Sequence, residues 1–133
     1  MDKKELVQRY RAFLREFKLG ASQVVVGAGG ALCVLGLRDE TSDIDVDVPL
    51  EVFNRLLKQG LPTHEFVTPG QKPVLVIEAA EFVDVHVRTN KDPVVFTDGV
   101  CHYAPEALLA FKQRLNREKD QEDIRKLKEY LGV

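Results

Sequence analysis

The chain has 133 residues, of which 19 are lysine or arginine and 21 are aspartate or glutamate, and its formal net charge is −2. This length is typical of one domain, so we expect a single domain over residues 1–133, and the charge balance lacks the basic excess that marks many nucleic-acid-binding domains. No apolar run approaches the roughly 20 residues that span a bilayer and the N-terminal stretch is unlike a signal peptide, so we expect a cytoplasmic protein.

The first half of the chain is predicted to alternate helices with short strands. Asp2 can cap a helix that runs to about Lys18, because large apolar residues recur there at helical spacing. A β-branched run predicts a strand over 24–26, and alternation of apolar and acidic residues predicts another over 44–48. Short helices are predicted over 30–37 and 50–58.

The second half begins with strands and ends with helices. Two strong strand patterns are separated by a tight connection and are expected to pair as a hairpin, and Asp98-Gly99 predicts a second hairpin with a two-residue turn. Pro105 can occupy the first position of a helix. The predicted strands are 65–68, 74–78, 82–88, 94–97 and 100–103, and the predicted helices are 105–115 and 117–131. The predicted class is therefore α+β, a small mixed or antiparallel sheet flanked by helices.

A glycine-rich turn follows the first predicted strand. Gly27, Gly29 and Gly30 come directly after the run of valines. Glycine lets the backbone turn sharply and approach a ligand closely, and backbone N–H groups can then point at an anion. The segment therefore suggests a phosphate-binding turn.

Three aspartates alternate with apolar residues in the next predicted strand. Period-two alternation places Asp43, Asp45 and Asp47 on one face, with neighbours about 7 Å apart. A row of like charges is unfavourable without a positive partner, and Mg²⁺ is commonly held by carboxylates together with substrate phosphates. The sequence therefore predicts a metal-binding strand.

A further aspartate occupies the middle of a later apolar strand. Alternation places Asp84, His86 and Arg88 on one face of the strand 82–88 and valines on the other. A carboxylate in such a strand is costly to bury without a partner, which makes Asp84 a candidate for the same site. The alternative is that Asp84 is an exposed residue of an ordinary two-faced sheet. His86 either lines the site or is a surface or hydrogen-bonded histidine.

Other chemistries fit less well. The glycines make half of a dinucleotide-binding fingerprint, but Leu32 replaces its last small residue, and no Gly-Lys-Ser/Thr follows for a P-loop. An EF-hand loop is excluded because Val48 and Pro49 follow the acids where glycine is required. Cys33 and Cys101 stand in apolar surroundings and are expected to be buried free thiols.

The glycines and the acids together resemble the signature of the polymerase-beta-like nucleotidyltransferases. That signature is Gly-Gly/Ser, a gap of about a dozen residues, and then Asp-apolar-Asp/Glu-apolar, which Gly29 and Asp43-Ile44-Asp45-Val46 match. Thr41, two residues before the first aspartate, is also similar to the family. Ala28 stands where the family has the first glycine, unless Gly29-Gly30 is the pair.

The C-terminal run resembles bacterial members of this family, including toxin and abortive-infection nucleotidyltransferases. They often show Pro-Glu…Leu-Leu…Lys and then Arg-x-Lys-Asp-x-x-Asp-Ile/Leu, which matches this chain from Pro105 to Ile124. By this resemblance Lys112 is a candidate triphosphate contact, and Lys119-Asp120 a structural or site-proximal pair. The alternative is a solvated helix face with ordinary ion pairs.

The resemblance implies a nucleotidyltransferase-like fold and a metal-dependent transfer of a nucleoside monophosphate from an NTP to a hydroxyl of an RNA, a protein or a small molecule. The cofactor implied is Mg²⁺ or Mn²⁺. The implied catalytic and metal-binding residues are Asp43, Asp45 and Asp84, and the implied nucleotide-binding residues are Gly29, Gly30, Thr41, Ser42 and Lys112. A catalytically inactive nucleotide-binding, regulatory or inhibitor protein of the same fold is the alternative.

Overall fold

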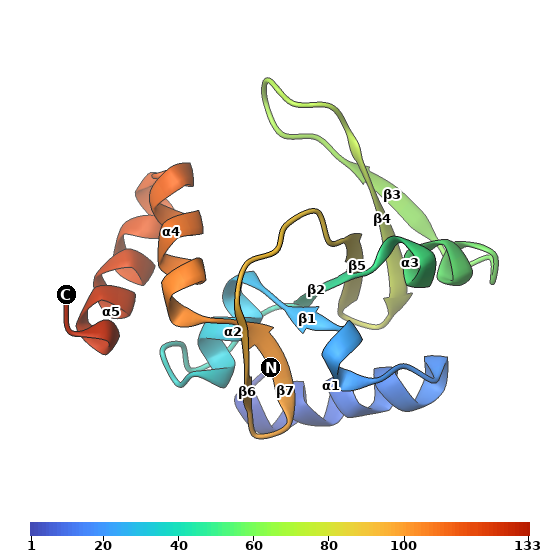
Figure 1. Ribbon diagram of the computed structural model, residues 1–133, viewed down its shortest axis with the longest axis horizontal. Coiled ribbons are helices and arrows are strands. Elements are labelled where there is room, and N and C mark those ends of the chain that lie inside the picture. Colours follow the sequence, from blue (N-terminus) through green and yellow to red (C-terminus); the bar gives the residue numbers. More distant parts are fainter.

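Seven strands form one mixed β-sheet in the computed structural model, which describes residues 1–133 (Figure 1). The strands are β1 (Val25–Val26), β2 (Ile44–Val48), β3 (Thr63–Phe66), β4 (Val74–Ala80), β5 (Val83–Val87), β6 (Val94–Thr97) and β7 (Val100–Tyr103). Their order across the sheet is β3-β4-β5-β2-β1-β7-β6. The β2–β5 and β1–β7 pairs are parallel and the other neighbours antiparallel, so the predicted α+β class with a mixed sheet is confirmed.

Five α-helices and two 3₁₀ turns accompany the sheet. They are α1 (Lys3–Phe17), α2 (Ala28–Val34), α3 (Leu50–Leu57), α4 (Pro105–Leu115), α5 (Gln121–Leu131), η1 (Ala21–Gln23) and η2 (Glu118–Asp120). Asp2 caps α1 as predicted, its Oδ1 accepting from the Glu5 amide at 2.9 Å. None of the helices combines the length and the apolar character that crossing a membrane requires.

Several predicted boundaries were wrong. The strand expected over 65–68 is β3, which begins two residues earlier because it pairs residue by residue with β4. The helix expected over 30–37 begins at Ala28 and ends at Val34. The helix expected over 117–131 begins only at Gln121, because Arg117 is extended and η2 precedes α5.

Both predicted hairpins are present. β4 pairs antiparallel with β5, and β6 with β7. Asp98 and Gly99, between β6 and β7, have φ of 52° and 79°, the positive values that a two-residue hairpin turn requires. Cys33 and Cys101 are buried free thiols, as predicted.

The two faces of the sheet differ in character. Ile44, Val46 and Val48 of β2 are buried in the main hydrophobic core with the apolar sides of α1 and α3. Because successive residues of a strand point to opposite faces, Asp45 and Asp47 point away from that core. The parallel pairing of β2 with β5 therefore sets the acidic residues of both strands on the face that the main core does not cover.

A smaller core supports the other half of the sheet. It joins β1 and β7 to α2, α4 and α5, and the two C-terminal helices lie side by side at the end of the molecule away from the β3–β4 hairpin (Figure 1). Its fully buried members include Leu32 of α2 and Leu127 of α5. This packing brings the C-terminal helices next to α2.

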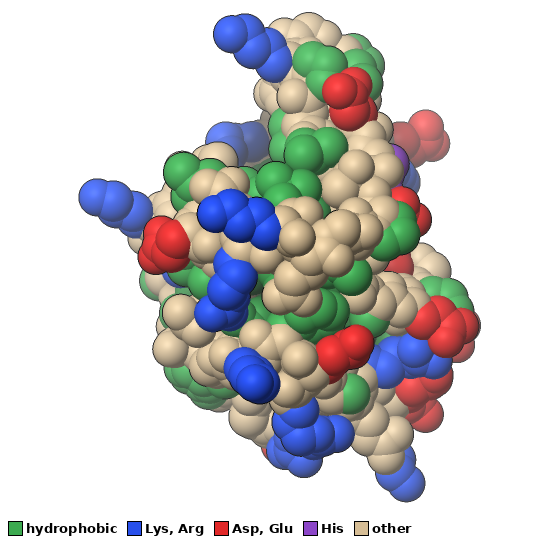
Figure 2. Space-filling model, turned by 90° about the vertical axis from the view of Figure 1, so that its right-hand side faces the viewer, with side chains coloured by type: hydrophobic (Ala, Val, Ile, Leu, Met, Phe, Trp, Pro, Cys, Tyr) green, Lys and Arg blue, Asp and Glu red, His purple; other side chains and the backbone are tan.

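The surface charge is uneven despite the small net charge. On the side that Figure 2 shows, Lys and Arg side chains outnumber acidic ones through the middle of the surface. Arg55 at the end of α3 donates to the carbonyl of Phe17 at the end of α1 at 3.5 Å, and the neighbouring Arg15, Lys18 and Lys58 are exposed.

Candidate metal centre

Three carboxylates from two separate segments converge at the edge of the glycine turn. Asp45 in β2 lies opposite Asp84 in β5, and Asp43 lies just before β2. One carboxylate oxygen of each of the three residues lies within 4.8 Å of those of the other two. The structure thus brings Asp84 together with Asp43 and Asp45, which the sequence placed on another strand.

The electrostatics of this cluster are unfavourable for three bare anions. Burial, and after it the neighbouring charge of Asp43, raises the pKa of Asp45 to about 6. Burial, together with Asp43, also raises the pKa of Asp84. Only oxygen donors converge here, which is the donor set that Mg²⁺ and Mn²⁺ prefer. The residues therefore fit a divalent cation, whose charge would relieve this repulsion.

The glycine turn lies beside the acids. The amide of Gly27 donates to the carbonyl of Asp45 at 3.0 Å, and α2 begins with the next residue. Ala28 has φ of 51°, a left-handed conformation that costs an L-residue about 1 kcal/mol. The position where the resembled family has glycine is thus one where glycine would be free of strain.

Gly29 and Gly30 are both closely packed. A Cβ on Gly29 would lie 2.5 Å from Nη1 of Arg38 and 3.2 Å from the Thr41 hydroxyl, and a Cβ on Gly30 would lie 2.9 Å from Val26. The guanidinium of Arg38 therefore lies directly against the turn. A contact of either glycine with phosphate remains a prediction.

Thr41 and Ser42 occupy different environments. Thr41 is buried, and its hydroxyl donates to the carbonyl of Asp43 at 3.0 Å. Ser42 is exposed. Thr41 thus holds the backbone that carries the first acid, while contact of either residue with a nucleotide remains a prediction.

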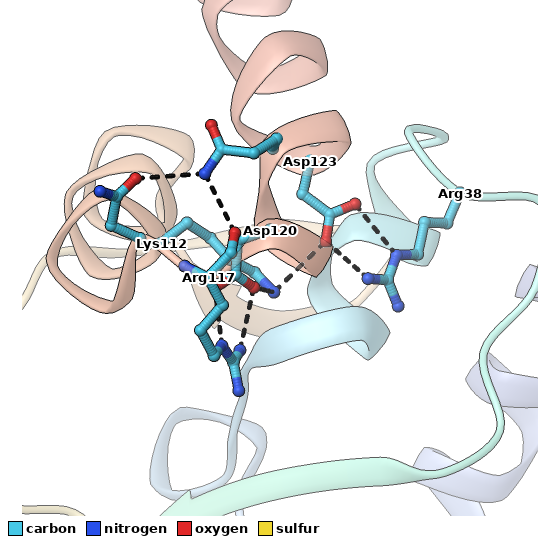
Figure 3. Close-up of polar contacts among 7 residues, drawn as sticks. Arg38, Lys112, Arg117, Asp120 and Asp123 are labelled. Atoms are coloured by element: carbon cyan, nitrogen blue, oxygen red, sulfur yellow. Dashed lines mark hydrogen bonds and ion pairs between the residues drawn. The ribbon is translucent and has the colours of Figure 1, made fainter.

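Lys112 lies in a buried ion-pair cluster formed by the C-terminal helices (Figure 3). Its ammonium lies 3.2 Å from Asp120 and 3.3 Å from Asp123. Arg117 also binds Asp120, through Nε at 2.7 Å and Nη2 at 2.9 Å. These contacts hold the pKa of Asp120 well below its usual range, the hydrogen bonds from Arg117 having the largest effect. Lys112 thus has two carboxylate partners within the chain, and its role as a triphosphate contact remains a prediction.

Arg38 connects this cluster to the glycine turn. Its Nη2 and Nε donate to the two oxygens of Asp123 at 2.6 and 3.3 Å, across 85 residues of sequence (Figure 3). Burial alone would raise the pKa of Asp123, but Arg38 and Lys112 together lower it. The third nitrogen of Arg38, Nη1, lies over Gly29. The C-terminal helices therefore fix a guanidinium beside the turn that adjoins the three acids.

We expect Gly29→Ala to destabilise the fold by about 1–3 kcal/mol, because its Cβ must displace an arginine that Asp123 holds in place. Gly20→Ala is the matched control, since the nearest atom to a Cβ there lies at 3.8 Å. Urea unfolding of both variants measures the difference. A Gly29→Ala variant as stable as Gly20→Ala would show that Arg38 moves freely.

The sequence did not reveal how Asp47 is bound. Tyr103 at the end of β7 donates from its hydroxyl to Oδ2 of Asp47. The two residues are 56 positions apart, and the signal available in the sequence was only that Asp47 shares a face with Asp45. Likewise, Arg38 and Asp123 were not predicted to meet.

No protein-family model and no curated protein matches this sequence. The functional interpretation therefore depends on the geometry and chemistry of the site.

Proposed function

We propose that the chain is a metal-dependent nucleotidyltransferase that moves a nucleoside monophosphate from an NTP to a hydroxyl acceptor. The observation that carries the proposal is the convergence of Asp43, Asp45 and Asp84 within 4.8 Å, beside a glycine turn. Sites for phosphoryl and nucleotidyl transfer depend on positioning and on neutralising the charge of the triphosphate, which this arrangement suits. The resemblance of the glycine and aspartate pattern to the polymerase-beta-like family supports the same reaction.

The three acids would hold Mg²⁺ or Mn²⁺. When bound, such ions neutralise charge on the triphosphate and make an acceptor hydroxyl more acidic. In the reaction the acceptor oxygen forms a bond to the α-phosphorus, the bond from that phosphorus to the bridging oxygen breaks, and pyrophosphate leaves. The hydroxyl proton passes to Asp84 or to water.

Arg38 would supply a positive charge to the triphosphate. Two of its nitrogens are engaged by Asp123, so the side chain is held in one orientation with Nη1 over Gly29. A guanidinium orients phosphate oxygens more strictly than a lysine does, because its donors form a planar fork. The turn and Arg38 would thus form the phosphate side of the proposed site, beside the acids.

The proposal is tested by incubating the purified protein with each labelled NTP, Mg²⁺ and a total cell extract. We expect one fraction of the extract to acquire label, with release of pyrophosphate, and we expect Asp84→Asn to abolish both while circular dichroism shows an unchanged fold. Label transfer by folded Asp84→Asn at the wild-type rate would contradict the mechanism. Binding of NTP with Mg²⁺ but without pyrophosphate release would instead identify an inactive nucleotide-binding protein.

A further inference from the structure

A second polar cluster, formed by Asp47, Tyr103 and Asn90, lies next to the three acids. Its Asp47 is on the same face of the sheet as Asp45. Asp47 follows Asp45 by two residues in β2, which places the two carboxylates about 7 Å apart. Asp47 is paired in register with His86 of β5, just as Asp45 is with Asp84. Asp47 is not among the three acids that converge to hold a cation. Asp47 therefore lies outside the proposed metal site, two residues further along β2.

Tyr103 contacts the other residues of this cluster through its hydroxyl and Arg88 through its ring. Its hydroxyl donates to Oδ2 of Asp47 and accepts from Nδ2 of Asn90 at 3.2 Å. The guanidinium of Arg88 lies 5.6 Å from the centre of the ring, and its Nη2 donates to the carbonyl of Asp92 at 2.6 Å. Tyr103 is only 8% exposed, so the hydroxyl is held in a fixed direction. The Asp47 carboxylate is thereby oriented through Oδ2.

The hydrogen-bonding capacity of Asp47 is largely unused. A carboxylate has about four acceptor positions, and the hydroxyl of Tyr103 is the one donor that this side chain engages within the protein. A half-buried carboxylate with so few donors is costly. Oδ1 of Asp47 therefore has no donor within the protein and can accept a hydrogen bond from a hydroxyl of a ligand.

We propose that Asp47, oriented by Tyr103, binds the hydroxyls of a ribose. This inference rests on the proposed nucleotidyltransferase activity. A neutral donor fits Asp47 because a phosphate would be repelled by the carboxylate. The spacing of about 7 Å from Asp45 places the acceptor oxygen about one sugar ring away from the proposed reaction centre. A site that hydrogen-bonds a substrate hydroxyl discriminates strongly against an analogue without it, because its polar group is then left unpaired.

Two substrates could present that ribose, namely the nucleoside triphosphate and the 3′-terminal nucleotide of an RNA acceptor. The first arm of the test compares the affinities of ATP and 2′-deoxyATP, with Mg²⁺, by calorimetry. The second arm compares a short oligoadenylate with the same oligomer ending in a 2′-deoxynucleotide, in the presence of a non-hydrolysable ATP analogue. We expect the wild-type protein to prefer the ribose form about tenfold or more in one of the two arms, and that arm identifies the source.

The variant Asp47→Leu should abolish this preference, so that the ratio of the two affinities approaches one. A purely structural role for Asp47 would weaken both ligands equally and leave the ratio unchanged. Glu16→Gln, an exposed residue of α1, is the control and should keep the wild-type ratio. If Asp47→Leu fails to fold, Tyr103→Phe keeps the ring and removes the orienting hydrogen bond, and a reduced ratio is expected there too.

The inference is overturned if the wild-type protein shows no ribose preference in either arm. It is also overturned if the preference survives in folded Asp47→Leu. Where Asp47→Leu does not fold, a preference that survives in folded Tyr103→Phe overturns it. The proposed function fails separately. Absence of both NTP binding and label transfer overturns the nucleotidyltransferase proposal and this inference with it, whereas transfer without ribose preference overturns the inference alone.

Discussion

Replacement of Asp45 by asparagine is expected to abolish nucleotide transfer and to stabilise the metal-free protein at neutral pH. The pKa of Asp45 is raised to about 6 by burial and by the neighbouring charge of Asp43, against an ordinary value of 3.8. Ionised Asp45 therefore opposes folding, by up to about 3 kcal/mol for a shift of this size. Asparagine removes the charge and keeps the shape. Substitutions of functional-site residues often increase stability while they remove activity.

The pH dependence follows from the direction of the shift. Below the unfolded pKa, Asp45 is protonated in both states and contributes nothing. Between that pKa and about 6 the folded state holds the proton more tightly than the unfolded state, so the stability contributed by Asp45 falls as the pH rises. The advantage of Asp45→Asn over the wild type should therefore be small near pH 4 and reach its full size above about pH 6.

Thermal unfolding in a chelating buffer at several pH values measures this difference. Addition of Mg²⁺ should then stabilise the wild type by mass action and leave Asp45→Asn nearly unchanged. Asp39→Asn, an exposed residue outside the cluster, should follow the wild type in both conditions. An Asp45→Asn variant that is less stable than the wild type at pH 7 without metal would show that Asp45 has a favourable partner in the fold.

Replacement of Lys112 by methionine is expected to destabilise the fold by about 3 kcal/mol. The ammonium lies between Asp120 and Asp123 and is only 6% exposed, so its removal leaves less compensation for two buried carboxylates. The loss should be at the lower end of the range for buried pairs, because Arg117 still binds Asp120 and Arg38 still binds Asp123. Methionine fills most of the space, so the effect is chiefly electrostatic.

Urea unfolding without nucleotide measures this loss, and Lys119→Met is the matched control. Lys119 is exposed in η2, one residue before Asp120, so its replacement should change stability by less than about 0.5 kcal/mol. Equal stability of the two variants would contradict a structural role for Lys112. Because nucleotide is absent, the measurement does not depend on the predicted contact of Lys112 with triphosphate, which is tested separately by NTP affinity in the folded variant.

Much of the sheet could be predicted because its signals are local. Alternation of apolar and polar residues correctly placed Asp45 and Asp84 away from the main core, and Asp98-Gly99 predicted a turn whose backbone needs positive φ. The boundaries were less accurate where pairing decides them. β3 begins at Thr63 because β4 offers it partners, and no residue pattern around Thr63 announces that start.

The sequence by itself determined which residues share a strand face and where the chain turns, since both depend on neighbours along the backbone. Only the tertiary structure decided which faces meet. The parallel pairing of β2 with β5 sets Asp45 beside Asp84, while the packing of the C-terminal helices brings Asp123 to Arg38, and β7 brings Tyr103 to Asp47. Contacts between groups so far apart along the chain form because burying apolar surface and pairing buried charges stabilise one arrangement of the whole chain, and no local pattern records them.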